Sequence, residues 1–127
     1  MKGLAPLAGY YGLVMGLADA HSIAWGCARA LHQRGAELVL SCLNEKARAA
    51  VQPLADELGA ALLVCNVEQD GALASLVDAA AARLGGLDFA VHSIAWAPLD
   101  DLHGRVVDSS AEGFARATRI SCHSFAE

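Results

Sequence analysis

The sequence predicts an α/β protein built on a Rossmann-type, doubly wound parallel sheet. Short apolar runs alternate with longer segments of helical periodicity, which gives the order βαβαβαβ followed by a helix. The apolar runs are continuous, as is typical of strands that helices cover on both faces. Right-handed crossovers between such strands produce a doubly wound sheet. No repeat or linker interrupts the pattern, so we expect residues 1–127 to form a single domain.

Each expected element is bounded by its own signals. We expect four strands, at residues 12–16, 37–42, 61–65 and 87–93. Three helices are expected between them, at residues 22–34, 45–58 and 70–84. Gly35, Gly59 and the pair Gly85-Gly86 end these helices, because glycine readily adopts the left-handed conformation of a helix end. Pro53 should kink the second helix or split off its first turn.

A loop and one more helix follow the fourth strand. Ser109 and Glu112 form the spacing of a capping box, which predicts that a helix begins there and runs on to Glu127. The elements expected from this sequence end with the fourth strand and the helix that follows. Strand 87–93 would then be an uncovered edge, and such an edge favours pairing with another chain. We expect self-association or a homo-oligomer.

Composition and charge exclude several classes of function. The chain has 127 residues, 55% of them apolar, and a net charge of −5. An acidic balance without a basic patch argues against nucleic acid as a partner. No apolar run approaches the roughly 18 residues of a membrane-spanning helix, and the N-terminus lacks the apolar core of a secretory signal. The expected compartment is the cytoplasm.

Cysteines and histidines give no sign of a metal or disulfide site. The four cysteines are widely separated and form no C-x-x-C pair, so we interpret them as small core residues. The five histidines lack the i, i+4 pairing and the neighbouring cysteines of a zinc site. We predict no metal ligands.

The stretch GLADAHSIAWG, residues 16–26, has the place of a phosphate-binding loop but not the G-x-G-x-x-G spacing. Gly16 ends the first strand, where positive φ or close approach is required. Ala18 is small, and Ser22 can both cap the next helix and donate to a phosphate. Gly26 is expected where that helix approaches the sheet closely. A structural turn is the alternative for this loop, because glycine-rich turns also occur without a ligand.

The ends of the next three strands should border the same crevice as this loop. Leu43 follows the second strand in place of the usual acidic residue, and an apolar side chain there favours adenosine without a 2′-phosphate. Lys46 and Arg48 lie nearby, so NADP is not excluded. Asn66 follows the third strand and either binds the adenine edge or serves as a turn residue.

Three segments together resemble a known family. The strings GLADAHSIAWGCARA, LNEKA and HSIAWAPLDDLHGRVVDSSAEGFA are similar to the NADH-dependent enoyl-acyl-carrier-protein reductases of bacterial type II fatty-acid synthesis. These enzymes belong to the short-chain dehydrogenase/reductase superfamily. The resemblance runs from about Gly3 to the end of the sequence. The segment HSIAWAP argues against a ketoacyl reductase, the nearest alternative chemistry.

The resemblance implies a role for individual positions. It implies that the domain binds NADH and that the completed enzyme acts on an enoyl thioester carried by acyl carrier protein. The implied cofactor-binding residues are Gly16, Ala18, Ser22, Ile23, Leu43, Asn66, Val67, Ser93, Ile94 and Ala95. Ala97 matches a position that lines the acyl pocket of the family.

Some positions depart from the family pattern. Asn66 stands where Asp is usual, which removes a charge from the adenine contact. Trp96 stands where Phe is usual and places a larger ring beside the substrate pocket. Tyr10 and Tyr11 replace a polar pair, and we expect these two aromatics near the surface.

The catalytic residues of the family are not matched. The family uses a Tyr and a Lys separated by six residues, with a second Tyr upstream, near the helix after a fifth strand. The tyrosines here are Tyr10 and Tyr11 and the lysines are Lys2 and Lys46, none of them suitably placed. The resemblance therefore implies an incomplete domain, truncated after the fourth strand and the helix that follows. We expect the N-terminal, cofactor-binding half of a reductase, inactive by itself. The alternatives are a non-catalytic NADH-binding or subunit-interaction module and an inactive remnant.

Overall fold

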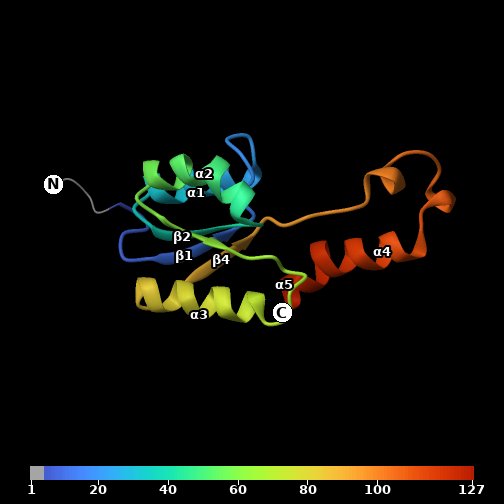
Figure 1. Ribbon diagram of the computed structural model, residues 1–127. Coiled ribbons are helices and arrows are strands. Elements are labelled where there is room, and N and C mark those ends of the chain that lie inside the picture. Colours follow the sequence, from blue (N-terminus) through green and yellow to red (C-terminus); the bar gives the residue numbers. More distant parts are fainter. Residues whose placement is uncertain (1–4) are drawn as a thin grey trace.

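A parallel sheet of four strands forms the centre of the computed structural model, which describes residues 5–127 (Figure 1). Lys2 and Gly3 lie outside the described residues. The strands are β1 (Tyr11–Met15), β2 (Glu37–Cys42), β3 (Ala61–Val64) and β4 (Phe89–His92). Their order across the sheet is β3-β2-β1-β4, all parallel. The predicted Rossmann-type fold class is confirmed, and β4 is an edge strand as expected.

Helices cover both faces of this sheet. The helices α1 (Ile23–Gln33) and α2 (Glu45–Glu57) lie on one face, and α3 (Ala72–Leu84) lies on the other (Figure 1). Because side chains alternate along a strand, the central strands supply two separate cores. Val14 and Leu40 pack with α1 and α2, whereas Leu13 and Val39 pack with α3. All four side chains are almost fully buried.

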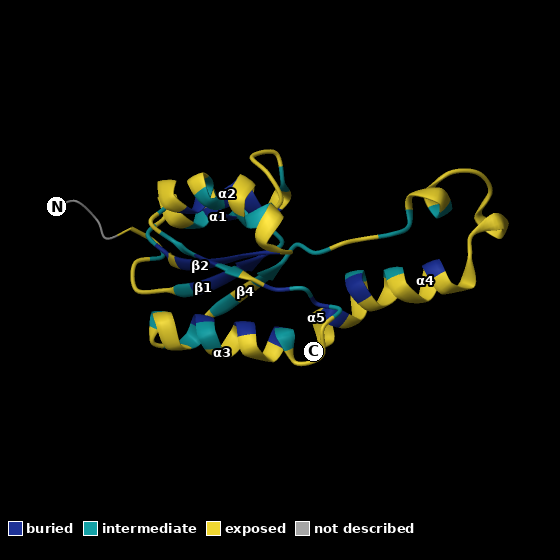
Figure 2. Ribbon diagram, viewed as in Figure 1, coloured by how far each residue is buried: buried dark blue, intermediate teal, exposed yellow. Residues whose placement is uncertain are grey.

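The chain beyond β4 leaves the sheet and returns to it. It contains the short 3-10 helices η1 (Leu99–Leu102) and η2 (Val106–Asp108), then α4 (Ala111–Thr118). A π-helical turn, η3 (Arg119–His123), and the short α5 (Ser124–Ala126) complete it. Residues 97–118 form an arm that projects from the sheet, and most of the arm is exposed (Figure 2). Ile120 returns to the core beneath Leu13.

Most predicted boundaries agree with the structure to within two residues. Pro53 is the exception, because α2 runs through it as one helix and no first turn is split off. The proline removes the hydrogen bond to the carbonyl of Ala49. Both residues are exposed, so water can satisfy that carbonyl and the cost stays low.

The predicted capping box is wrong by one residue. Ser110, not Ser109, is the N-cap of α4, and its hydroxyl oxygen accepts a hydrogen bond from Gly113 N–H at 3.0 Å. Ser109 instead donates to the carbonyl of Val106 at 2.8 Å, because η2 ends there. Asp101 selects Ser110 by accepting both its N–H and its hydroxyl, at 3.0 and 2.7 Å.

The cysteine prediction is partly wrong. Cys42 and Cys65 are buried as expected, and burial raises the pKa of both thiols. Cys27 is half-buried, and Cys122, which belongs to η3, is exposed. Tyr10 is exposed and Tyr11 half-buried, which agrees with a surface position for this pair. No helix among residues 5–127 has the length and apolar character needed to cross a membrane.

Candidate functional site

A cavity of about 970 Å³ lies where the carboxyl ends of the four strands meet. Ligand pockets in proteins usually measure about 300–1,000 Å³, and parallel α/β sheets bind their ligands at this edge. All ten residues predicted to bind a cofactor line it: Gly16, Ala18, Ser22, Ile23, Leu43, Asn66, Val67, Ser93, Ile94 and Ala95. The topology thus brings together residues that span 80 positions of the sequence.

Gly16 cannot be replaced by a larger residue without moving the backbone. Its φ is +95°, a conformation that favours glycine. A Cβ atom at this position would also collide with the carbonyl oxygen of Ser93 at the end of β4. Both reasons given for a glycine at the strand end, positive φ and close approach, are therefore confirmed.

The N-terminus of α1 faces the cavity, since Ser22 and Ile23 line it. Ser22 caps this helix by accepting from Trp25 N–H at 3.3 Å, as predicted. Its hydroxyl donates to the carbonyl of Asp19 at 2.7 Å, and that bond must open before Ser22 can donate to a ligand. The N–H groups of a first helical turn form a natural anion site.

The prediction for Gly26 is wrong. Gly26 is exposed, and a Cβ atom there would meet nothing within 4 Å. Ala24 and Ala28, one helical turn apart, are fully buried and make the close approach to the sheet. Residues two positions away from them lie on the opposite side of the helix.

The end of β2 presents an apolar surface to the cavity. Leu43 is 55% exposed there, and Asn44 follows as the N-cap of α2 by accepting from Ala47 N–H at 2.8 Å. Arg48 points elsewhere, with its guanidinium near Glu45 at 3.4 Å and donating to the carbonyl of Leu62 at 3.2 Å. Lys46 and Arg48 are not among the residues that line the cavity.

Asn66 has the turn role that was one of its two interpretations. Its side-chain oxygen accepts from Glu68 N–H at 3.0 Å, and its carbonyl accepts from Gln69 N–H at 3.0 Å. This turn places Asn66, Val67 and Glu68 side by side on the cavity wall. The amide nitrogen of Asn66 is the group left to donate to a ligand.

The segment after β4 forms the wall facing Gly16. Ser93 N–H continues the sheet by donating to the carbonyl of Met15 at 3.1 Å. Ile94 packs on the core beneath the sheet, and Ala95 is exposed. Ala97, the predicted substrate contact, is half-buried and is not one of the lining residues.

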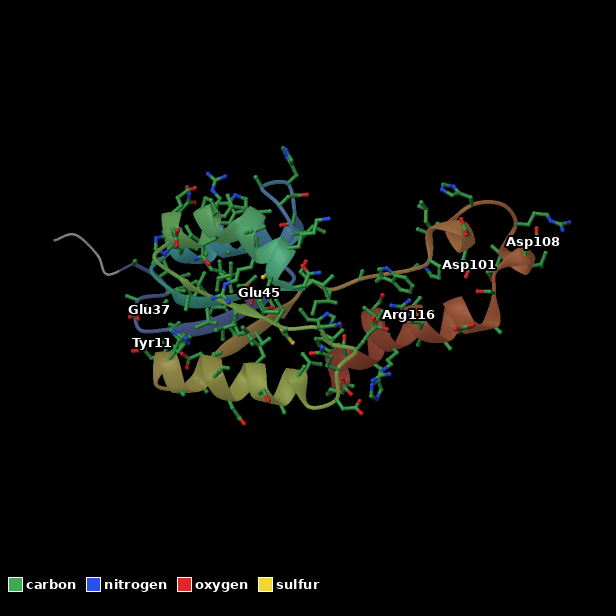
Figure 3. The ribbon with its side chains drawn as sticks, in the orientation of Figure 1. Tyr11, Glu37, Glu45, Asp101, Asp108 and Arg116 are labelled. Carbon is green, nitrogen blue, oxygen red and sulfur yellow. The ribbon has the colours of Figure 1, made fainter. Side chains whose placement is uncertain are left out.

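Several lining residues were not found from the sequence. The most important are Glu68 and Arg116, which form a bidentate salt bridge. The Arg116 guanidinium donates to the two carboxylate oxygens of Glu68 at 2.7 and 2.9 Å. The hydrogen bond from Arg116 lowers the pKa of Glu68, and Glu68 raises that of Arg116. The two positions are 48 residues apart, so no spacing rule could join them. In Figure 3, Arg116 lies on α4, whereas Asp101 and Asp108 lie nearer the tip of the arm.

His92, the last residue of β4, is held by the returning chain. Its Nε2 lies 2.8 Å from the hydroxyl of Ser124, which itself donates to the carbonyl of Ile120 at 2.6 Å. Because that hydroxyl has one hydrogen, His92 Nε2 must be the donor of the pair. The ring of Phe125 meets the ring of His92 edge-on, with centroids 5.5 Å apart.

The charged groups of the lining form one ion pair. Within residues 5–127 the lining holds neither tyrosine nor lysine, and its carboxylate, Glu68, is paired with its guanidinium, Arg116. No group of three or more His, Cys, Asp or Glu in that same span could hold a metal ion. A second cavity of about 430 Å³ lies at the opposite end of the sheet, near Glu37 and Arg83.

Comparison with known proteins gives consistent matches. A family model described as Enoyl-(Acyl carrier protein) reductase matches residues 16–127. The enoyl-[acyl-carrier-protein] reductase [NADH] 2 of Rhizobium meliloti is 43% identical over the whole chain, which covers 47% of that protein. The NADH-dependent FabI of Enterococcus faecalis is 38% identical over 88% of the chain, and 44% of its own length is covered. The chain thus spans about half the length of the curated relatives it matches.

Solved structures match over nearly the whole chain. The enoyl-acyl-carrier-protein reductase of Anaplasma phagocytophilum, crystallised with NAD, has a TM-score of 0.91 at 35% identity. It matches 99% of this chain, which covers 48% of that one. The Bacillus cereus enzyme, crystallised with NADP+ and indole naphthyridinone, has a TM-score of 0.90 at 38% identity, with 95% and 48% coverage.

Proposed function

The chain belongs to the enoyl-(acyl carrier protein) reductase family, and we propose that it is the N-terminal, cofactor-binding part of an NADH-dependent reductase. The observation that carries this proposal is the convergence of all ten predicted residues on one cavity. The cofactor would supply a hydride for the double bond of a trans-2-enoyl thioester on acyl carrier protein. The residues of this chain would bind and orient the cofactor within a single, incomplete dinucleotide-binding domain.

The cavity fits a dinucleotide at both the phosphate and the base end. Because Gly16 carries no side chain, its backbone is presented to the cavity at the end of β1. We assign the pyrophosphate to Gly16, Ala18, Ser22 and Ile23, where the N-terminus of α1 favours negative charge. The segment Ser93–Ala95 would then follow the nicotinamide ribose.

The adenosine would lie across the ends of β2 and β3. We assign its adenine ring to Leu43, Asn66 and Val67. Ala97, which follows the Ser93–Ala95 segment at the opposite end of the cavity, is assigned to the substrate. An apolar Leu43 offers no cation to a 2′-phosphate, and Arg48 is occupied by Glu45 and the Leu62 carbonyl. NADH is therefore expected to bind more tightly than NADPH.

We further propose that the chain by itself binds NADH without turnover. Reduction of an enoyl thioester develops negative charge on the thioester oxygen, and a hydrogen-bond donor must stabilise it. Loss of one such donor costs on the order of 10²–10³ in rate. The absence of Tyr10, Tyr11 and Lys46 from the lining favours this non-catalytic binding role for the isolated chain.

Calorimetric titration of the 127-residue chain with NADH and with NADPH tests the proposal. We expect saturable binding of NADH, weaker binding of NADPH, and no loss of NADH absorbance when trans-2-octenoyl N-acetylcysteamine thioester is added. Leu43→Arg should reduce the preference for NADH, because it adds a cation beside the 2′ position, while Gly26→Ala, outside the cavity, should leave both affinities unchanged. If a correctly folded chain gives no heat of binding with NADH, the assignment is overturned.

A further inference from the structure

Two arginines of the chain that returns from the arm hold the turn after β3. The guanidinium of Arg116 donates to both carboxylate oxygens of Glu68, at 2.7 and 2.9 Å. Arg119 donates to the backbone carbonyl of Glu68 at 3.1 Å and to the carboxylate of Asp70 at 3.2 Å. The side chain and the main chain of Glu68 are therefore both fixed by the α4–η3 segment.

One side of the α4–η3 segment presents these groups together. Residues three and four apart lie on the same side of a helix, so Arg116, Arg119 and Ile120 face the same way. Ile120 is buried in the same core as Val67, which belongs to the turn. An apolar anchor flanked by two guanidinium groups thus docks the segment on the turn at residues 66–70.

The turn held in this way is a wall of the cavity. Asn66, Val67 and Glu68 all line it. The side-chain oxygen of Asn66 accepts from Glu68 N–H at 3.0 Å, so the position of Glu68 also decides where the amide nitrogen of Asn66 is directed. Arg116 and Arg119 therefore act on the cavity through Glu68.

The same segment is fixed at the other end of the cavity by Trp96. The guanidinium of Arg116 stacks over the indole at 4.2 Å from the ring centroid. Trp96 N–H donates to the hydroxyl of Ser121 at 2.8 Å, and that hydroxyl donates to the Trp96 carbonyl at 3.0 Å. Lysine could not reproduce the planar pairing and stacking of Arg116. The segment thus connects the chain that follows β4 to the chain that follows β3, the two edge strands.

We propose that Arg116 and Arg119 are positioning residues for cofactor binding, which hold the turn at residues 66–70 and so set the cavity wall at its β3 end. This inference rests on the proposed function, because that wall is the one assigned to the adenosine. Glu68, Arg116 and Arg119 lie outside the three segments that carry the family resemblance.

Neutralising each partner in turn separates positioning from direct attraction of an anionic cofactor. A direct role makes Arg116→Gln weaken NADH binding and Glu68→Gln strengthen it, because NADH is negatively charged. A positioning role makes both weaken it, because either substitution breaks the pair. We expect calorimetric titration to show roughly 2- to 5-fold weaker binding in each, the range for an exposed ion pair. The double variant should be no weaker than either single one.

Two further titrations locate the effect. ADP-ribose, which lacks the nicotinamide, should lose affinity by the same factor as NADH in Glu68→Gln. Arg119→Gln should also weaken NADH binding, although Arg119 is not one of the lining residues. Arg105 and Asp108 are the matched control, a bidentate pair with both bonds at 2.8 Å, near the tip of the arm and not in the lining. Asp108→Asn should leave NADH affinity unchanged.

Amide hydrogen exchange tests the holding of the turn without any ligand. The N–H groups of Glu68 and Gln69 are hydrogen-bonded within the turn. We expect their exchange to accelerate in Arg116→Gln and Arg119→Gln by more than that of Val14 N–H, which lies in the central strand β1 and reports global unfolding. Arg116→Lys should restore the protection only in part.

The results separate the two proposals. A wild-type chain that does not bind NADH overturns the proposed function, while hydrogen exchange still decides whether the arginines hold the turn. Equal acceleration at the turn and at Val14 overturns that holding. A Glu68→Gln chain that binds NADH as tightly as the wild type, or more tightly, overturns the positioning role in cofactor binding. So does an unchanged affinity for ADP-ribose.

Discussion

The carbonyl oxygen of Ser93 occupies the place that a Cβ atom on Gly16 would need. This close approach lies between the end of β1 and the end of β4, which the hydrogen bond from Ser93 N–H to the Met15 carbonyl holds together. Gly16→Ala must therefore push β4 away and adopt a strained positive φ. Each such backbone strain costs about 1–3 kcal/mol.

We expect Gly16→Ala to lower the free energy of unfolding by at least about 1–3 kcal/mol and to abolish NADH binding. Urea unfolding and calorimetric titration measure the two effects. Gly26→Ala is the control within the same loop and helix. It should raise stability by about 0.5–1 kcal/mol, because Gly26 is an exposed helix residue with free space around it. Equal effects of both substitutions would contradict the role assigned to Gly16.

Ser110 and Ser109 should differ in their contribution to stability. Ser110→Ala removes the N-cap of α4 and the bond to Asp101, and we expect it to cost about 1 kcal/mol. Ser109→Ala removes one exposed hydrogen bond and should cost about 0.5 kcal/mol or less. Chemical denaturation of both variants measures this difference, and a larger loss for Ser109→Ala would show that the cap lies elsewhere.

Stability should fall in acid because three solvent-accessible carboxylates, half-buried or exposed, have lowered pKa values. Arg116 lowers the pKa of Glu68, Ser110 that of Asp101 and Arg105 that of Asp108. The unfolded chain, with carboxyl pKa values near about 4, binds protons before the folded chain does. Stability is thus complete well above about pH 4 and is lost as the pH falls through the lower folded values.

Urea midpoints across this pH range measure that dependence. Glu68→Gln should make the midpoint depend less on pH, and added salt should do the same because these pairs are exposed. A pH dependence that Glu68→Gln leaves unchanged would assign the acid sensitivity to other groups.

Self-association is expected from the exposed apolar side chains of the arm. Phe114 is 71% exposed and Val106 is 90% exposed, and β4 is an uncovered edge. Such surfaces drive association at micromolar to millimolar concentration. Sedimentation at tens of micromolar should therefore show oligomers, and the double variant Phe114→Ser, Val106→Ser should reduce them. A wild-type chain that sediments as a stable monomer would rule this out.

The sequence predicted the fold because each element carries its own local signal. Buried strands are continuous apolar runs in the sequence. Gly35, Gly59 and Gly85 lie at the helix ends, where each adopts a positive φ. Strand ends in a parallel sheet share one edge, so Leu43, Asn66 and Ser93 could be assigned to one cavity before any coordinates. These inferences need only periodicity and the parallel topology.

The sequence-based predictions were wrong where the outcome depended on which face of a helix packs on the sheet or on which neighbouring side chain reaches a helix end. Gly26 was assigned the close approach that Ala24 and Ala28 make, because helix phase relative to the sheet is set by packing. Ser109 has the capping-box spacing to Glu112, but Asp101, brought near by η1, accepts both the N–H and the hydroxyl of Ser110 and makes Ser110 the cap.

By itself, the sequence determined the parallel, doubly wound class of the sheet, the glycine at the end of β1 and the family resemblance. These follow from local conformational preference and from the burial of apolar runs. The tertiary structure alone decided that Glu68, Arg116 and Trp96 form one stack and that Ser121 holds the backbone of Trp96. Those contacts join residues 20 to 48 positions apart, and the path of the arm back to the sheet brings them within reach.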